Sequence, residues 1–115
     1  MKLFRNLTFL SLILVLFSCA NAQDKNPVAT AKFVVSGNCE MCKKTIETSL
    51  ETKGVKSADW NEKTKMIEVV YQPSKISEEK LHELIAAVGY DTEKKKADDK
   101  AYQALPECCQ YTRKK

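Results

Sequence analysis

The pattern of hydrophobic and polar positions in the first half of the chain predicts a strand followed by a helix. From Ala31 the apolar residues recur at every second position, as they do on a half-buried strand, and this run stops at residues 36–38. Residues 42–52 then carry apolar side chains four positions apart on one face. That spacing predicts an amphipathic helix, which Gly54 ends.

The second half of the pattern predicts a hairpin, another helix and a final strand. Residues 55–60 and 65–71 are two strand-like runs joined by a polar turn. Ser77 is a suitable N-cap for a helix whose apolar residues fall at i, i+3, i+4 and i+7 and which Gly89 terminates. Residues 90–96 predict one last strand, and the run of lysines in it indicates an exposed edge.

The order of these elements is strand, helix, strand, strand, helix, strand, which is the split βαβ arrangement. It predicts an α+β domain over residues 31–97, with a four-stranded antiparallel sheet and both helices on one face. Residues 23–30 are polar and aperiodic, so we expect them to form a linker. Beyond the domain, residues 98–115 predict a short helix over 98–105 and a cysteine-containing tail.

The first residues of the chain have the features of a secretory signal peptide. A basic start precedes an apolar run over 7–17, and small residues at 20–22 offer a cleavage site, so we expect residues 1–22 to be removed. The run is shorter than the roughly 20 residues that a membrane-spanning helix needs, and no transmembrane span is expected. Because residues 16–19 also resemble a lipobox, the alternative is a lipid anchor at Cys19. The sequence therefore predicts an extracytoplasmic protein, in the periplasm or tethered to a membrane.

Length and charge exclude two broad classes of function. The chain has 115 residues, which is enough for one small domain and too few for most multidomain enzymes. Its net charge of +4 falls to +2 when residues 1–22, which hold Lys2 and Arg5, are removed. The chain has no basic stripe with interleaved aromatic residues, so nucleic acid is excluded as a partner.

The motif with a definite chemical meaning is Cys39-x-x-Cys42, which falls where a strand ends and a helix begins. Sulfurs at i and i+3 can converge on one ion, and the unpaired N–H groups at a helix start favour thiolate. Lys43 and Lys44 add positive potential in the same turn. Two soft ligands at low coordination number indicate Cu(I), with Hg(II) as the alternative. Zn(II) normally takes four ligands, and the pair alone would leave it under-coordinated.

At this point the chain resembles the heavy-metal-associated domains of copper chaperones, copper-transporting ATPase modules and periplasmic mercury-binding proteins. The resemblance covers residues 31–96 and rests on the cysteine motif, on the element order and on Gly89-Tyr90-Asp91 after the second helix. It implies a ferredoxin-like fold and reversible metal binding. It also implies that Cys39 and Cys42 are the ligands and that Tyr90 lies beside the metal loop.

The metal loop departs from the family pattern at two positions. The family motif runs Gly-Met-x-Cys-x-x-Cys, whereas Ser36 and Gly37 stand here where the Gly and the Met would be. Met41 lies between the two cysteines instead, and its thioether either reaches the metal or merely packs. The departure affects the expected metal preference more than the expected fold.

The adjacent pair Cys108-Cys109 lies outside the family domain and has several interpretations. The tail can fold back over the metal loop and add one or two thiolates to the ion. The other interpretations are a separate soft-metal site, a disulfide to another chain, or exposed thiols without a role. His82, the one histidine of the chain, is expected at the surface or its boundary, and Trp60 in or near the core.

We expect a non-enzymatic protein that binds a soft metal, Cu(I) first, through Cys39 and Cys42. Such a protein would buffer the ion or hand it to a metal-transporting ATPase or other efflux component by thiolate exchange. Whether a metal bridges two copies into a dimer is left open. The alternatives are mercury scavenging, a thiol-disulfide redox protein that uses the same pair, and an interaction module with structural cysteines.

Overall fold

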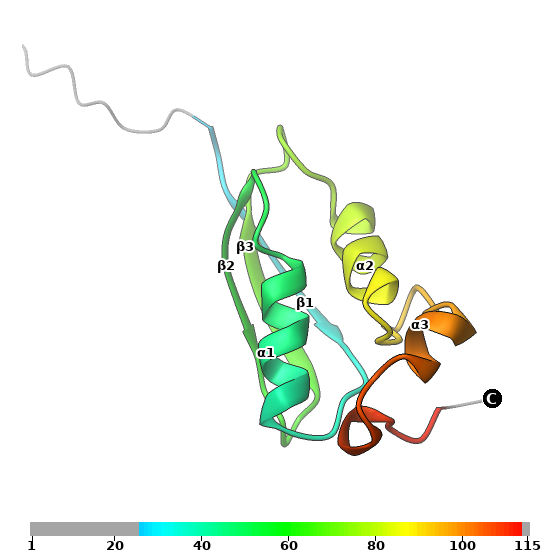
Figure 1. Ribbon diagram of the computed structural model, residues 1–115. Helices are drawn as coiled ribbons and strands as arrows, with labels where there is room; N and C mark the ends of the chain where they lie inside the picture. The colour runs from blue at the N-terminus through cyan, green and yellow to red at the C-terminus, as the bar shows by residue number, and fades with distance from the viewer. Residues whose placement is uncertain (1–25, 114–115) are drawn as a thin grey trace, which may run out of the picture.

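The structure is a computed structural model that describes residues 26–113 as a three-stranded antiparallel sheet covered on one face by two helices (Figure 1). The elements in chain order are strand β1 (Ala29–Val34), helix α1 (Glu40–Ser49), strands β2 (Val55–Trp60) and β3 (Met66–Tyr71), helix α2 (Glu78–Ala87), the short helix α3 (Asp99–Gln103) and the 3-10 helix η1 (Glu107–Cys109). The strand order is β1-β3-β2. The predicted α+β fold with both helices on one face is confirmed.

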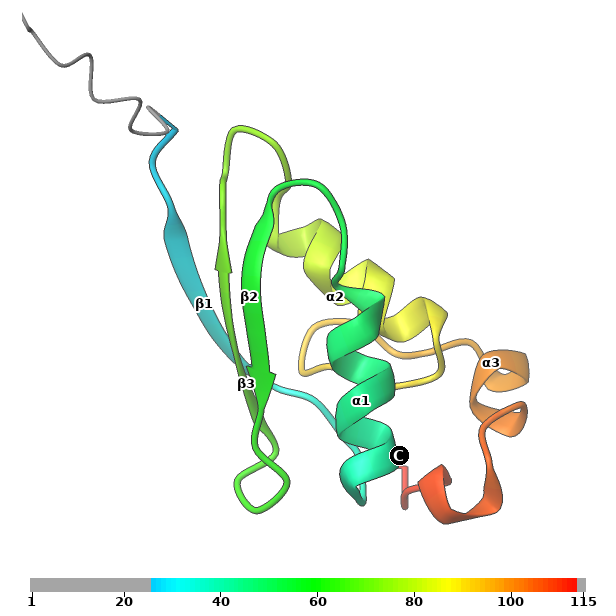
Figure 2. The same cartoon turned by 60° about the vertical axis from the view of Figure 1, so that its left-hand side comes forward.

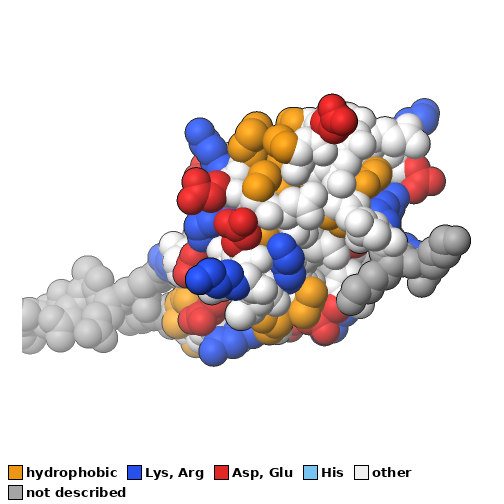
Figure 3. Space-filling view, turned by 90° about the horizontal axis from the view of Figure 1, so that it is seen from below, with side chains coloured by type: hydrophobic (Ala, Val, Ile, Leu, Met, Phe, Trp, Pro, Cys, Tyr) orange, Lys and Arg blue, Asp and Glu red, His pale blue; other side chains and the backbone are white. Residues whose placement is uncertain are grey.

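The core lies between the sheet and the two helices. In the register of the sheet, Phe33 of β1 and Trp60 of β2 both pair with Ile67 of β3, and all three side chains are buried. The helices contribute Ile46 from α1 and Ile85 from α2, which are fully buried. The alternation read from the sequence therefore assigns the correct face of each element to the core. On the molecular surface seen from below, by contrast, side chains of both charges are mixed with hydrophobic ones (Figure 3).

The predicted elements have the positions that the pattern gave them, with small shifts at their ends. Strand β1 begins at Ala29, two residues before the predicted start. Helix α1 begins at Glu40 rather than at residue 42, and Ser77 caps helix α2 by accepting a hydrogen bond from the Lys80 N–H at 3.1 Å. The predicted short helix in the tail is confirmed as α3.

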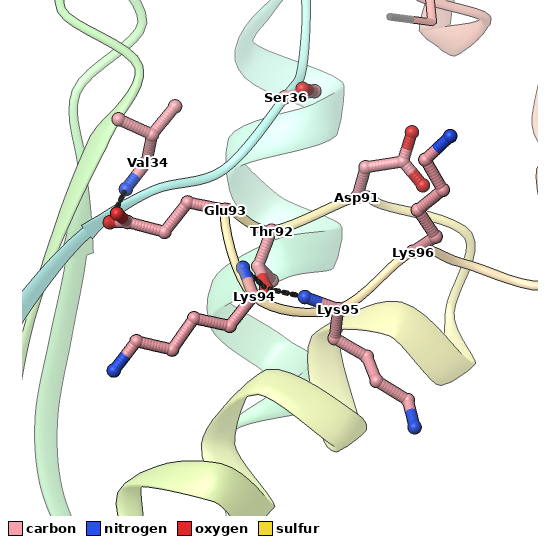
Figure 4. Close-up of a pocket in the computed structure, with 8 residues that line it drawn as sticks. All are labelled: Val34, Ser36, Asp91, Thr92, Glu93, Lys94, Lys95 and Lys96. Atoms are coloured by element: carbon pink, nitrogen blue, oxygen red, sulfur yellow. Dashed lines mark hydrogen bonds between the residues drawn. The ribbon is translucent and has the colours of Figure 1, made fainter. Parts of the chain in front are cut away.

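The predicted last strand over residues 90–96 is wrong in extent. Only one antiparallel bridge forms, between Val35 and Thr92. The Thr92 hydroxyl accepts backbone N–H groups of the next turn at 3.0 and 3.3 Å, and the Glu93 carboxylate accepts the Val34 N–H at 2.9 Å (Figure 4). These bonds satisfy groups that a strand ladder would have paired, so the segment turns away from the sheet after one residue.

The turn over residues 92–95 covers His82, which the sequence places at the surface or its boundary. That prediction is wrong, because the side chain is 2% exposed. Its Nδ1 lies 2.5 Å from the Thr92 hydroxyl, and its ring stacks on Phe33 with the centroids 3.9 Å apart. Burial lowers the pKa of His82, although Glu78 opposes the shift. The histidine is a core residue that the loop replacing the fourth strand encloses.

Trp60 supports the loop that carries the first cysteine. Its side chain is 1% exposed, and its Nε1 donates to the backbone oxygens of Val35 at 3.0 Å and Lys65 at 3.2 Å. A Cβ atom on Gly37 would lie 2.9 Å from two atoms of the indole ring and 3.3 Å from the Cβ of Cys42. The indole thus takes the space that a methionine at position 37 would need, which explains the departure from the family pattern.

The C-terminal tail folds back onto the segment that follows helix α2. The Tyr111 hydroxyl donates to the Gly89 oxygen at 2.9 Å and accepts the Asp91 N–H at 2.8 Å. The Arg113 guanidinium makes a two-pronged contact with the Asp91 carboxylate, at 2.9 and 3.0 Å. Both cartoon views place η1 beside the first turn of α1 (Figures 1 and 2). Contacts that involve no sulfur therefore help to hold the tail cysteines beside the N-terminus of α1.

The close approach of helix α3 to the C-terminal end of α2 depends on Gly89. Its φ of 104° lies in the left-handed region, and a Cβ atom there would be 2.7 Å from the backbone oxygen of Ala101. Arg113 makes two more contacts that hold the tail in place. It donates a hydrogen bond to the Ala97 oxygen at 2.7 Å, and its guanidinium carbon lies 5.0 Å from the ring centroid of Tyr102.

No helix among residues 26–113 is long and apolar enough to cross a membrane. The predicted signal peptide, its cleavage site and the alternative lipid anchor at Cys19 lie outside the described residues.

We predict that Gly37→Ala destabilises the protein by about 1–3 kcal/mol, because the new methyl group overlaps the indole of Trp60 in a packed core. Urea unfolding followed by Trp60 fluorescence measures the change. Ser36→Ala, one position earlier in the loop, is the matched control. Equal unfolding midpoints for Gly37→Ala and the wild type would show that the loop has room for the methyl group.

We predict that acid releases the tail in a transition that belongs to Asp91. Burial raises the pKa of this carboxyl, but the hydrogen bonds from Arg113 and from the Ala97 N–H outweigh burial and hold the pKa below its ordinary value of 3.8. A depressed pKa contributes stability that is complete above the ordinary value and is lost as the pH falls through the folded value. NMR signals of the Tyr111 amide should therefore report a docked tail from pH 7 to about pH 5 and its release below pH 3.8.

The matched variant for this acid transition is Asp91→Asn, which keeps the side chain's size and cannot titrate. Its tail should be less protected than that of the wild type at pH 7, by roughly the 1.5–3 kcal/mol of hydrogen bonds to a charged group. The same acid transition in Asp91→Asn would assign it to another carboxyl group.

Candidate metal centre

The Cys39-x-x-Cys42 motif lies at the N-terminus of helix α1, as the sequence predicts. Cys39 is the N-cap residue, with extended backbone angles of −152° and 178°, and its side chain is half-buried. Cys42 lies in the first turn on the inner face and is fully buried. The two sulfur atoms are 3.6 Å apart. The loop between β1 and the start of α1 therefore presents two converging thiols, one buried and one accessible.

The backbone of the loop favours the thiolate form of Cys42. Its sulfur accepts a hydrogen bond from the Asn38 N–H at 3.4 Å. Burial by itself raises the pKa of Cys42, but the hydrogen bonds from the Asn38 N–H and the Cys109 thiol outweigh it and hold the pKa below its ordinary value. Donors aimed at a sulfur stabilise the thiolate, which is the form that binds metals.

Lys43 does not add positive potential to the thiols, contrary to the expectation from the sequence. Its Nζ lies 2.6 Å from the Glu47 carboxylate, 2.7 Å from that of Asp59 and 2.7 Å from the Trp60 oxygen. The Asp59 and Glu47 carboxylates raise the pKa of Lys43. The lysine therefore fastens α1 to the end of β2, and Lys44 is exposed.

The tail cysteines fold back over the metal loop, which is the first of the interpretations left open by the sequence. Cys109 is 1% exposed, and its sulfur lies 3.9 Å from that of Cys39. Cys108 is exposed, and its sulfur lies 3.9 Å from that of Cys109. The sulfurs of Cys39, Cys108 and Cys109 all lie within 4.8 Å of one another, a spacing at which they can hold one metal ion. The four described cysteines are free thiols.

The backbone of the tail is also tied to the loop. The Cys108 oxygen accepts hydrogen bonds from the Asn38 side chain at 3.5 Å and from the Cys39 thiol at 3.8 Å. Burial raises the pKa of Cys109 to about 12, and the hydrogen bond to Cys42 adds to the shift. Cys109 is thus a protonated thiol in the ion-free protein, and a cation that binds it must displace its proton.

Tyr90 lies beneath the sulfur atoms, where the family resemblance expects it. Its side chain is fully buried, and its hydroxyl oxygen makes no hydrogen bond of regular geometry within residues 26–113. Burial raises the pKa of Tyr90 well above its usual range, and the neighbouring thiols of Cys42 and Cys109 raise it further. Its ring stacks on Tyr111, with the centroids 5.8 Å apart. A buried phenol therefore lies where the centre meets the core.

Met41 lies on the outer side of the centre and is 54% exposed. Its sulfur accepts a hydrogen bond from the Cys108 thiol at 3.6 Å. The thioether thus packs on the tail rather than into the core.

The four cysteines and the packing of Tyr111 against the domain were predictable from the sequence, but the ion pair between Asp91 and Arg113 was not predicted. The available signal was the pair of complementary charges at Asp91 and Arg113, with Tyr111 between the tail cysteines and that arginine. Such a signal has no fixed spacing, because a tail can return to a domain along many paths.

Three comparisons give the same relationship for this chain. Residues 33–91, just over half of the chain, match the heavy-metal-associated domain model. A zinc-transporting ATPase of Synechocystis sp. is 42% identical over 67 residues, which is 56% of this chain and 9% of the ATPase. The chain thus spans less than a tenth of that curated relative.

Solved structures agree with the sequence match. The CopZ metallochaperone is 32% identical, with a TM-score of 0.54 over 56% of this chain and 98% of that one. Oxidized MerP from Ralstonia metallidurans is 26% identical, with a TM-score of 0.55 over 58% of this chain and 96% of that one. The cysteine motif at the start of α1, the βαββα core and the matched residues lead to one conclusion: the chain belongs to the heavy-metal-associated domain family.

Proposed function

We propose that this protein binds one soft metal ion, Cu(I) first, between Cys39 and Cys42 and passes it on by thiolate exchange. The observation that supports this most directly is the 3.6 Å separation of the two sulfurs at the start of α1. Low coordination number and polarizable ligands favour Cu(I) and Hg(II) over hard cations. Among the relatives, CopZ is a metallochaperone, and a zinc-transporting ATPase shares the domain.

The difference in burial between the two thiols supports a directed exchange. Cys39 is half-buried and Cys42 fully buried, so an incoming thiolate of a partner reaches the ion from the side of Cys39. A bond forms between the ion and the partner's sulfur, the bond to Cys39 breaks, and Cys39 takes up a proton from water. Cys42 leaves in the same way in a second step, with no change in the oxidation state of the metal or the sulfurs.

The partner fitting this exchange is a metal-transporting ATPase or another efflux component that presents its own cysteine pair. The N-terminal soluble domains of CopA from Bacillus subtilis, a P-type ATPase, are similar to this chain, at 29% identity and a TM-score of 0.55. Matched domains would allow two similar loops to meet and share the ion. Delivery to such a domain is part of our proposal.

Secretion is a further part of the proposal and is supported by the charge and hydropathy pattern of residues 1–22 alone. We propose release into the periplasm after residue 22, with lipidation at Cys19 as the alternative. Mass spectrometry of the protein from an extracytoplasmic fraction distinguishes an N-terminus at Gln23 from a lipidated Cys19.

We predict that the double variant Cys39→Ser, Cys42→Ser lowers Cu(I) affinity by roughly a hundredfold or more, because loss of a mere supporting contact already costs 10–100-fold. Anaerobic titration of Cu(I) against a competing chelator, with reductant present, measures the affinity. The wild type should bind one tight equivalent. Thr48→Ala, at an exposed position further along the same helix, is the control.

Parallel titrations with Hg(II) and Zn(II) rank the metals. Tighter binding of Hg(II) than of Cu(I) under matched competition, together with protection of cells from mercury alone, would replace copper with mercury as the cargo. Full Cu(I) affinity in the double variant would contradict the proposed site.

A further inference from the structure

We propose that Cys109 is a third thiolate ligand, delivered by the docked tail, for the same ion that Cys39 and Cys42 bind. The inference rests on the proposed function and deepens it. The tail would then set the coordination number of the ion, at three sulfurs when it is docked and two when it is released.

The spacing of the sulfur atoms fits a shared ion. The Cys39 sulfur lies 3.6 Å from that of Cys42 and 3.9 Å from that of Cys109. Three sulfurs at the usual metal–sulfur distance of about 2.3 Å around a trigonal ion are about 4.0 Å apart. In the ion-free protein the Cys39 sulfur therefore already lies near the separation that a common ion requires from the sulfurs of both Cys42 and Cys109.

Burial distinguishes Cys109 from an incidental neighbour. Its side chain is 1% exposed and faces Cys42, which is fully buried, with the phenol of Tyr90 beside both thiols. A buried site without competing water strengthens the bond between a soft cation and a thiolate. Cys109 thus lies on the buried side of the centre with Cys42 and Tyr90, and Cys39 is the more accessible thiol.

Contacts outside the sulfur cluster help to position Cys109. The bonds from Tyr111 to Gly89 and from Arg113 to Asp91 hold the tail, and each bond lies outside the sulfur cluster. A ligand that other contacts have already ordered loses little freedom when the ion binds. The tail is therefore preorganised for coordination.

Cys108, the neighbouring thiol, is less suited than Cys109 to be the third ligand. It is exposed, and its sulfur donates a hydrogen bond to the thioether of Met41 on the outer surface. Its sulfur also lies within 4.8 Å of Cys39, so the two tail cysteines form a matched pair for an experiment. The two cysteines are adjacent in sequence, and only Cys109 is buried.

A third ligand gives the exchange a gate. With the tail docked, the ion has three protein sulfurs and is lost slowly. A partner that displaces the tail breaks the bond between the ion and Cys109, which regains its proton, and leaves the ion on Cys39 and Cys42 for exchange. No oxidant or reductant takes part.

The test measures the number of sulfur ligands around Cu(I) by X-ray absorption in the full mature chain, with one equivalent of Cu(I) and reductant. We expect three sulfurs in the wild type and in Cys108→Ser, and two in Cys109→Ala. The rate of Cu(I) loss to an excess of chelator should rise about 10–100-fold in Cys109→Ala, the range for loss of a supporting group at a metal site. Arg113→Gln, which keeps all the sulfurs and loosens the tail, should also speed the loss.

Controls separate this inference from the proposed function. NMR signals of Tyr111 show whether the tail of Cys109→Ala is still docked, and Arg113→Gln reports on docking without altering a cysteine. Two sulfurs in the wild type, or three in Cys109→Ala, would overturn the inference while leaving the Cys39 and Cys42 site intact. Full binding in the Cys39→Ser, Cys42→Ser variant would instead overturn the proposed function.

Discussion

The backbone and carboxylate of Asp91 hold the metal loop and the C-terminal tail together. Its backbone oxygen accepts the N–H of Ser36 in the loop at 2.9 Å, and its carboxylate binds Arg113 and the Ala97 N–H. Its own N–H donates to the Tyr111 hydroxyl. A buried carboxylate is tolerated only when it is paired, so the loop and the tail cannot separate without leaving these groups unsatisfied. One residue that carries no thiol thus links the segments that contain the two cysteine pairs.

Two of the thiols that gather at the N-terminus of α1 have pKa values shifted in opposite directions. Hydrogen bonds lower the pKa of Cys42 despite its burial, whereas burial raises the pKa of Cys109. Neighbouring thiolates repel one another in a site of low dielectric, and a cation removes that repulsion. Metal binding in such a centre is therefore coupled to proton release.

Local patterns predicted much of the fold and part of the site. The two long helices, the hairpin and the cysteine motif all follow from spacing within a few residues, and all are present. The predicted fourth strand does not form, because the side chains of Thr92 and Glu93 accept hydrogen bonds from backbone N–H groups that a strand pairing would have used. His82 was misplaced for the same reason, since the resulting turn covers it. The pairing of Lys43 was not predicted, because one carboxylate partner, Glu47, lies one turn further along α1 and the other, Asp59, lies on strand β2.

The amino-acid sequence by itself determined the identity of the family, the presence of two converging thiols at a helix start and the residue types in the tail. These depend on periodicity and on i, i+3 geometry, which are properties of neighbouring residues. Only the tertiary structure decided that Cys109 returns to the motif, that Trp60 fills the space under Gly37 and that Asp91 links the loop to the tail. Such contacts join residues far apart in the chain, and their geometry arises from the packing of the whole domain, because no short stretch of sequence contains both partners.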